Sequence, residues 1–269
     1  MAKIFLTESD NREFNHPEKY AFLNWYMDDG MGTNRQEQQR QQVSDEYHMG
    51  RGYLGNALLS LYLIIGKNEC NVADIIVFPI LFDVWHGLEL WLKSACTAIE
   101  LLFGDTIKKK RNHDIYDYYD KLDAYIKVKG FQFIKDNALV ELEMLISEFR
   151  KVNANFDFAR YSFDVKSDYQ FYNAPYESDK QWQKSNAKIE NNKVVPNTCL
   201  DLAETFNMVL NTFITFGNFV ECLNILLDTG EVLSDEGYRE YIDTVVRCER
   251  LLNTDSKIDV LDELINLIL

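Results

Sequence analysis

Residues 78–93 read FPILFDVWHGLELWLK, an apolar segment that a few ionisable side chains interrupt. His86, Glu89 and Lys93 stand at positions i, i+3 and i+7, so a helix places them on one side over about two turns. Charged side chains are costly to bury in an apolar helix unless they are paired or neutralised. We therefore expect this segment to be the central helix of a bundle and its polar stripe to be a candidate site.

The composition is that of an ordinary soluble globular protein. The chain has 269 residues, of which 46% are hydrophobic, which is enough to build a sizeable core. A net charge of −15 argues against broad nucleic-acid binding, because phosphate contacts need clustered Lys and Arg, and residues 108–111 form the one dense basic run. Long uninterrupted apolar runs and a signal-peptide core are missing from the sequence, so we expect a cytoplasmic location and no membrane partner.

Hydrophobic periodicity predicts a mainly α fold. The expected helices span residues 34–66, 74–103, 114–128, 136–152, 198–228, 234–252 and 258–269. Residues 1–33 show little periodicity and are predicted to form an irregular arm, whereas residues 34–269 are predicted to form a single helical domain. Between residues 155 and 197 the period shifts toward two, which predicts a small extended insertion with a hairpin that turns at Asn191 and Asn192.

Unusual polar residues gather in three segments of the chain. These segments are residues 86–93 (HGLELWLK), 111–117 (RNHDIYD) and 158–164 (FARYSFD). Together they resemble bacterial members of the HEPN superfamily, in which a proline-led helix carries a His, Glu and Lys stripe, a His-Asp pair opens the next helix, and an Arg-Tyr pair follows a later turn. The resemblance covers about residues 75–164 and places a HEPN-like core at about residues 72–230, followed by C-terminal helices at 234–269.

The resemblance implies a helical, often dimeric domain that acts on RNA or a nucleotide in toxin-antitoxin or phage-defence systems, or that serves there as a scaffold. It implies candidate catalytic residues His86, Glu89 and His113 and ligand-binding residues Lys93, Arg111, Arg160 and Tyr161. Ribonuclease members of the family carry an arginine and a histidine about four to six residues apart on one helix. This chain departs from that spacing, because His113 follows Arg111 by only two positions and no arginine lies shortly before His86.

Each of these residues also has a structural interpretation. Glu89 and Lys93 have the spacing of an ordinary helical ion pair, and His86 is typical of a hydrogen-bonded core histidine. Asp114 has the position of a helix cap, and Arg160 with Tyr161 suits a clamp onto the bundle. If the candidate residues converge, they supply a general base, a carboxylate that orients it, and cations for a phosphate.

Metal and cofactor sites are not predicted. His86 and Glu89 have the i, i+3 spacing of di-metal helical bundles, but a second copy of that motif is missing from the sequence. The five cysteines are widely spaced and form no CxxC pair, which predicts reduced thiols rather than disulfides or a zinc site.

Two hypotheses follow from the sequence. The first is a HEPN-like protein that binds or acts on RNA or a nucleotide. The second is a non-catalytic assembly module, in which the polar stripe is structural and helical surfaces such as the apolar segment 258–269 bind a protein partner or a second copy of the chain. The second hypothesis is favoured by the missing ribonuclease spacing and the acidic composition.

Overall fold

The computed structural model describes residues 34–65, 72–104, 113–152, 188–190, 193–195 and 200–252, together with Leu267. Helices make up nearly all of these ranges, so the predicted mainly α class is confirmed. The predicted arm at residues 1–33 and most of the predicted last helix at 258–269 lie outside the described residues.

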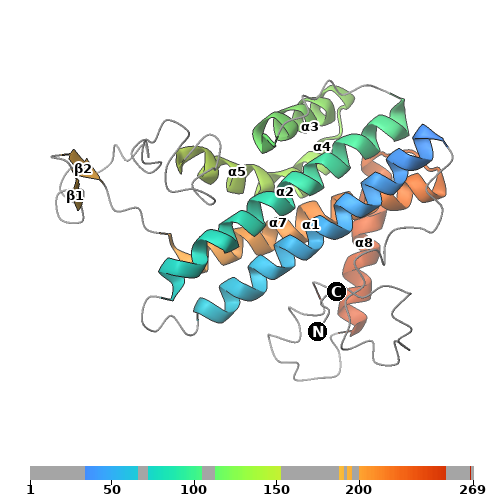
Figure 1. The fold of residues 1–269 in the computed structure, drawn as a ribbon. Helices are drawn as coiled ribbons and strands as arrows, with labels where there is room; N and C mark the ends of the chain where they lie inside the picture. Colours follow the sequence, from blue (N-terminus) through green and yellow to red (C-terminus); the bar gives the residue numbers. More distant parts are fainter. Residues whose placement is uncertain are drawn as a thin grey trace, which may run out of the picture.

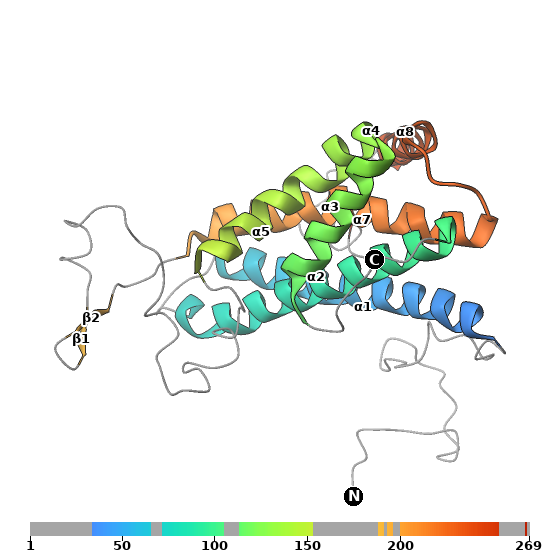
Figure 2. The same ribbon diagram turned by 90° about the horizontal axis from the view of Figure 1, so that it is seen from above.

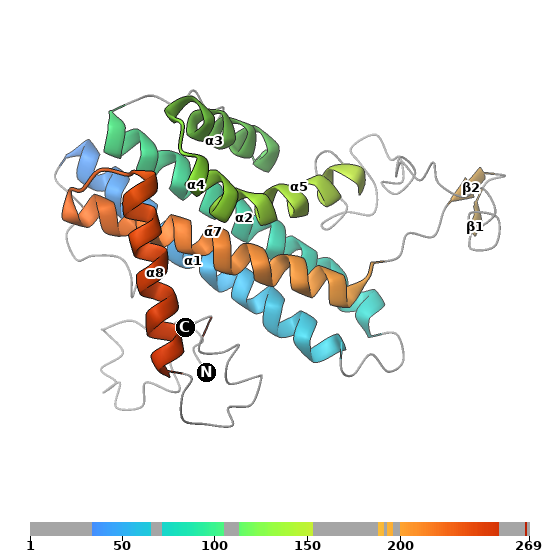
Figure 3. The same ribbon diagram turned by 180° about the vertical axis from the view of Figure 1, so that it is seen from behind.

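Three long helices form the body of the protein. They are α1 (Arg35–Ile65), α2 (Ala73–Phe103) and α7 (Leu202–Thr229). Figures 1 and 3 show the three helices side by side, with α1 and α2 running antiparallel and α7 packed against both. Because α2 is apolar on nearly every side, it is buried between its neighbours along much of its length.

Short local signals set the ends of these helices. The side chain of Asn34 accepts hydrogen bonds from two backbone N–H groups in the first turn of α1, and Gly104 ends α2 with a φ of 67°. The predicted boundaries at these two residues are confirmed. The predicted start of α7 at residue 198 is wrong, because Asp201 caps the helix and its first residue is Leu202.

A shorter helical layer packs across this body. It consists of α3 (Ile115–Lys129), α4 (Gln132–Ile134), a π-helical turn η4 (Lys135–Leu139) and α5 (Val140–Val152). Seen from above, α3 crosses α2, and α5 packs on α7 (Figure 2). The sequence predicted one helix from residue 136 to residue 152, so its start was placed too late and the π turn was missed.

The position at which α4 begins depends on a residue that lies far along the chain. Asp235, the first residue of α8 (Asp235–Leu252), accepts hydrogen bonds from the backbone N–H groups of Phe133 at 3.0 Å and Ile134 at 3.1 Å. These N–H groups would otherwise be unsatisfied at the start of a helix. The carboxylate therefore caps α4 and also fastens α8 to the rest of the bundle.

Two short strands lie in the segment between α5 and α7. β1 (Lys188–Glu190) and β2 (Lys193–Val195) pair antiparallel, with Ile189 opposite Val194. The remainder of the expected insertion at residues 155–197 lies outside the described residues.

Trp91 of α2 occupies the centre of the three long helices, where its side chain is 1% exposed. A Cβ atom on Gly50 of α1 would lie 2.4 Å from the Trp91 ring, and one on Gly217 of α7 would lie 2.7 Å from it. The indole Nε1–H donates a hydrogen bond of 2.9 Å to the carbonyl oxygen of Tyr47. The two glycines therefore make room for one large ring that contacts all three helices.

The contact between α1 and α2 gives a test of this packing. A Cβ on Gly87 would lie 2.6 Å from Cγ of Leu54 and 3.0 Å from the carbonyl oxygen of Gly50, so we expect Gly87→Ala to destabilise the protein by about 1–3 kcal/mol. Gly52 has open space around it, and Gly52→Ala should stabilise α1 by about 0.5–1 kcal/mol. Urea denaturation of both variants checks the pair, and equal effects would contradict the close approach at Gly87.

Two of the described helices, α2 and α7, are long and apolar enough to cross a membrane by length and composition. The buried share of their most apolar windows is 56% in α2 and 50% in α7. Core helices of soluble proteins pass the same test, so this property is only a weak indication of a membrane span.

Candidate functional site

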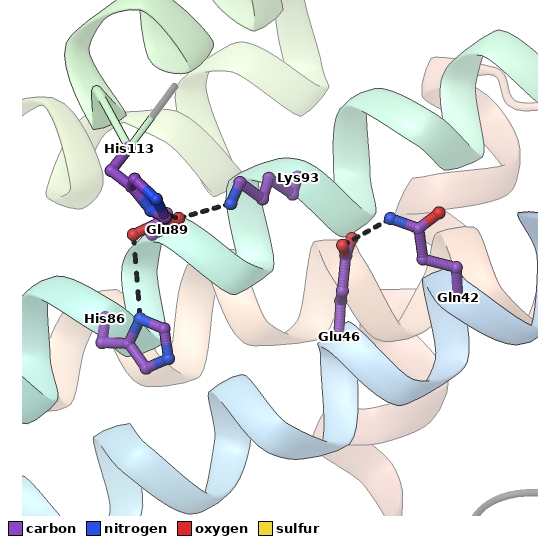
Figure 4. Close-up of polar contacts among 6 residues, drawn as sticks. All are labelled: Gln42, Glu46, His86, Glu89, Lys93 and His113. Atoms are coloured by element: carbon purple, nitrogen blue, oxygen red, sulfur yellow. Dashed lines mark hydrogen bonds and ion pairs between the residues drawn. The ribbon is translucent and has the colours of Figure 1, made fainter. Parts of the chain in front are cut away.

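Glu89 of α2 is the centre of the predicted site. Its carboxylate is fully buried, and three nitrogen-bearing side chains converge on it (Figure 4). Oε1 accepts a hydrogen bond from Nζ of Lys93 and lies 2.8 Å from Nδ1 of His113, while Oε2 lies 3.7 Å from Nδ1 of His86. The structure thus brings together four of the residues predicted from the sequence, and we call these four side chains the Glu89 cluster.

The cluster combines a buried carboxylate with three side chains that are partly or largely exposed. The side chains of His86 and Lys93 are 24% and 23% exposed, and that of His113 is 77% exposed. The arrangement is therefore neither an open cleft nor a sealed core network. A molecule at the surface would meet these three side chains before it met the carboxylate.

Opposing effects set the charge state of Glu89. Burial alone would raise its pKa, but interactions with His86, Lys93 and His113 outweigh burial and lower the pKa to about 2. Glu89 is therefore ionised at neutral pH and can only accept hydrogen bonds. It follows that Nδ1 of His113 carries the proton in their contact, which leaves Nε2 as the other nitrogen of that ring.

His86 is held by aromatic rings on both sides of the α1–α2 contact. The ring of Tyr53 meets it edge-on at a centroid distance of 4.6 Å, and the ring of Phe82 stacks on it at 5.7 Å. Nδ1 of His86 and Oε2 of Glu89 are both buried and make no hydrogen bond to the described residues. At 3.7 Å their separation is slightly longer than a hydrogen bond, so these two polar atoms are the least satisfied part of the cluster.

His113 reaches Glu89 because of how α3 begins. Oδ1 of Asp114 accepts hydrogen bonds from the backbone N–H groups of Tyr116 at 3.0 Å and Asp117 at 3.3 Å, so the capping interpretation of Asp114 is confirmed. This cap fixes the direction in which the chain enters α3, and α3 packs on α2. His113, one residue before the cap, is thereby placed over the buried carboxylate.

The other predicted site residues are not among those the structure describes. Arg111, Arg160 and Tyr161 all lie outside the described ranges. Within those ranges, His, Cys, Asp and Glu side chains form no group that could hold a metal ion. Of the five cysteines, the side chains of Cys96 and Cys222 are described, and both are buried free thiols.

A shallow depression lies next to His86 and was not predicted from the sequence. Its volume is about 290 Å³, and its lining consists of Met49, Gly52, Tyr53, Asn56 and Asp83. Nδ2 of Asn56 donates a hydrogen bond of 2.6 Å to Oδ2 of Asp83 across the α1–α2 contact. Burial raises the pKa of Asp83, and the Asn56 hydrogen bond and the nearby His86 oppose that rise.

One signal for this depression was present in the sequence. Asp83 precedes His86 by three positions and extends the polar stripe of α2 by almost one turn. The residues of α1 gave no such signal, because only the packing of the two helices places them beside Asp83.

Comparison with protein-family models, with curated proteins and with solved structures found no match to this chain. The class of protein that the fold and site define is therefore a mainly α bundle with a buried, histidine-flanked carboxylate on its central helix.

Proposed function

We propose that this chain is a HEPN-like protein that binds a phosphate group of RNA or of a nucleotide at the Glu89 cluster. The observation that supports the proposal most is the convergence of His86, Lys93 and His113 on one buried carboxylate, with all three side chains partly or largely exposed. Two of the three segments that carry the resemblance meet at this point. We also propose that the helices form a HEPN-like bundle and that residues 155–197 form a small extended insertion in it.

The cluster suits acid–base chemistry at a phosphodiester. Glu89 orients an imidazole through Nδ1, so Nε2 is the nitrogen that can exchange a proton with a substrate. In RNA cleavage one imidazole would take the 2′-hydroxyl proton while the 2′-oxygen bonds to phosphorus. The other would protonate the 5′-oxygen as its bond to phosphorus breaks, which leaves a 2′,3′-cyclic phosphate and a 5′-hydroxyl.

Lys93 is the cation available for the phosphate charge. Its ammonium group already pairs with Glu89, so these two charges cancel, and the cluster is net positive only when an imidazole is protonated.

A second candidate function has its own supporting observation. The contact between Glu89 and His113 joins the middle of α2 to the residue that precedes the cap of α3, and the carboxylate is fully buried. Such a network can serve to hold α3 in place within a non-catalytic assembly module. The further expectations of a cytoplasmic location, a defence or toxin-antitoxin role, a homodimer or protein partner and no membrane partner belong to the proposal in either form.

Matched substitutions separate binding from structure. We expect Lys93→Ala to weaken binding of a fluorescent single-stranded RNA or of a nucleoside monophosphate by about tenfold or more, since a charged hydrogen bond is lost. Lys121→Ala is the control, because Lys121 also pairs with a carboxylate four residues away and its side chain is 24% exposed. Fluorescence anisotropy measures both.

The histidines are tested in the same way. If the protein cleaves RNA, His86→Ala and His113→Ala should each slow cleavage by about 10²–10⁴-fold, with His48→Ala of α1 as the control. Variants that melt as the wild type does and bind and cleave equally well would overturn the proposed site. Variants that lower the melting temperature sharply, in a wild-type protein that binds neither RNA nor nucleotide, would favour the assembly module.

A further inference from the structure

The depression beside His86 borders the Glu89 cluster at Tyr53. Tyr53 lines the depression and also contacts the ring of His86, so one aromatic side chain forms part of both. Asp83 stands six residues before Glu89 on α2, which corresponds to about 9 Å along the helix axis. A ligand that occupies both places must therefore have two different ends separated by a short spacer.

The walls of the depression suit a flat aromatic ring. Tyr53 supplies a ring and the half-exposed Met49 supplies a thioether, and both groups contact π-systems favourably. Gly52 adds no side chain, and a Cβ atom there would meet nothing within 4 Å. The space above Gly52 is thus open, and it lies between polar groups and apolar groups as in small-ligand sites.

The polar edge of the depression accepts hydrogen bonds. A carboxylate has about four acceptor positions, and Asn56 occupies one of those on Asp83. Because Asn56 turns its NH₂ group toward Asp83, its own amide oxygen is a further acceptor. The edge therefore fits a ring that presents neighbouring N–H donors, and among the nucleobases guanine does so with N1–H and N2–H₂.

We infer that this depression is a guanine subsite, in which Asp83 accepts the N1–H and N2–H₂ groups while a phosphate of the same nucleotide meets Lys93 and the histidines. The inference rests on the proposed function and adds to it the identity of the nucleobase that is bound. A free guanosine monophosphate and a guanine within an RNA strand have the same recognition chemistry. Adenine presents an acceptor at N1, so Asp83 should disfavour it.

The experiment measures binding of the full chain to guanosine, adenosine and xanthosine monophosphates by isothermal titration calorimetry. The wild type should prefer guanosine monophosphate about tenfold or more over adenosine monophosphate. Asp83→Asn should shift the preference to xanthosine monophosphate, since the new amide group donates to the C2 oxygen of xanthine. Asp74→Asn, at an exposed position of the same helix, is the control and should change nothing.

A second variant blocks the subsite without touching its polar groups. Gly52→Leu should fill the open space and weaken guanosine monophosphate binding by about tenfold or more, with a melting temperature equal to or above that of the wild type. Short RNAs with a single guanine or a single adenine form the second arm, and a guanine preference in either arm supports the subsite.

Two results would overturn the inference: one contradicts the guanine subsite alone, and the other contradicts the proposed function as well. Equal binding of the three nucleotides by the wild type and by Asp83→Asn would remove the guanine subsite while the phosphate site remained. Failure of every nucleotide and both RNAs to bind at millimolar concentration would remove the proposed function together with the subsite.

Discussion

Trp91→Ala should lower the free energy of unfolding by about 3–5 kcal/mol, the range found for the loss of large buried aromatic side chains. Trp91 fills the space that Gly50 and Gly217 leave open, and it contacts the rings of Tyr47, Phe213 and Phe216. Alanine would leave a cavity at the meeting point of α1, α2 and α7, and all three long helices would lose contacts. Urea denaturation, with the midpoint and slope fitted together, measures the change.

Trp91→Phe separates the ring from its hydrogen bond. Phenylalanine keeps most of the apolar contact but removes the N–H donor, so the carbonyl oxygen of Tyr47 loses that bond. We expect a smaller loss of about 1–3 kcal/mol for this variant. Equal losses for the two variants, or a loss below about 1 kcal/mol for Trp91→Ala, would contradict the central position assigned to the ring.

The long helices were predictable because their signals are local. Apolar periodicity located α1 and α2, and the predicted outer ends at Asn34 and Gly104 lie within one residue of the observed ends, where a side-chain cap begins α1 and a left-handed glycine ends α2. Each of these signals acts over a few neighbouring positions, so it can be read without knowledge of the tertiary fold.

The start of α4 and the π turn η4 were not predictable for the opposite reason. The N–H groups at the start of α4 are satisfied by Asp235, which lies about a hundred positions further along the chain. A contact over such a separation leaves no pattern in the residues around 132–139. Asp235 itself looked like an ordinary residue in the first turn of α8.

The candidate site also combines residues that local spacing predicted with residues that only tertiary packing brings together. His86, Glu89 and Lys93 share a helical face, so the period of the helix alone predicted that they lie together. The approach of His113 and the depression at Asp83 both depend on packing against another element, α3 in one case and α1 in the other. Sequence spacing within one helix could not indicate which side chains these elements bring.

Glu89→Gln should remove an acid-dependent part of the stability. The folded pKa of Glu89, about 2, lies below its ordinary value of 4.5, so the ionised carboxylate stabilises the fold fully above pH 4.5. That contribution is lost as the pH falls from 4.5 toward 2. The difference between the two pKa values corresponds to about 3 kcal/mol.

The measurement is a series of urea denaturations from pH 7 to pH 2 on the wild type and Glu89→Gln. The wild type should be more stable by about 3 kcal/mol at pH 7, and the two curves should converge toward pH 2. Glu148→Gln is the matched control, because Glu148 pairs with Lys151 at the surface and an exposed pair contributes at most about 1 kcal/mol. Parallel curves for the wild type and Glu89→Gln would contradict the depressed pKa.

The double variant Glu89→Gln with Lys93→Met tests whether the charges of the cluster serve the stability of the fold or the binding of a ligand. Removal of both charges together should restore much of the stability that Glu89→Gln loses, since the ammonium group is no longer left without its partner. His113 would still find an acceptor in the amide oxygen of the substituted side chain, so the fold at the start of α3 should survive. A double variant that regains stability but loses phosphate binding would show that the charges are kept for the ligand and not for the fold.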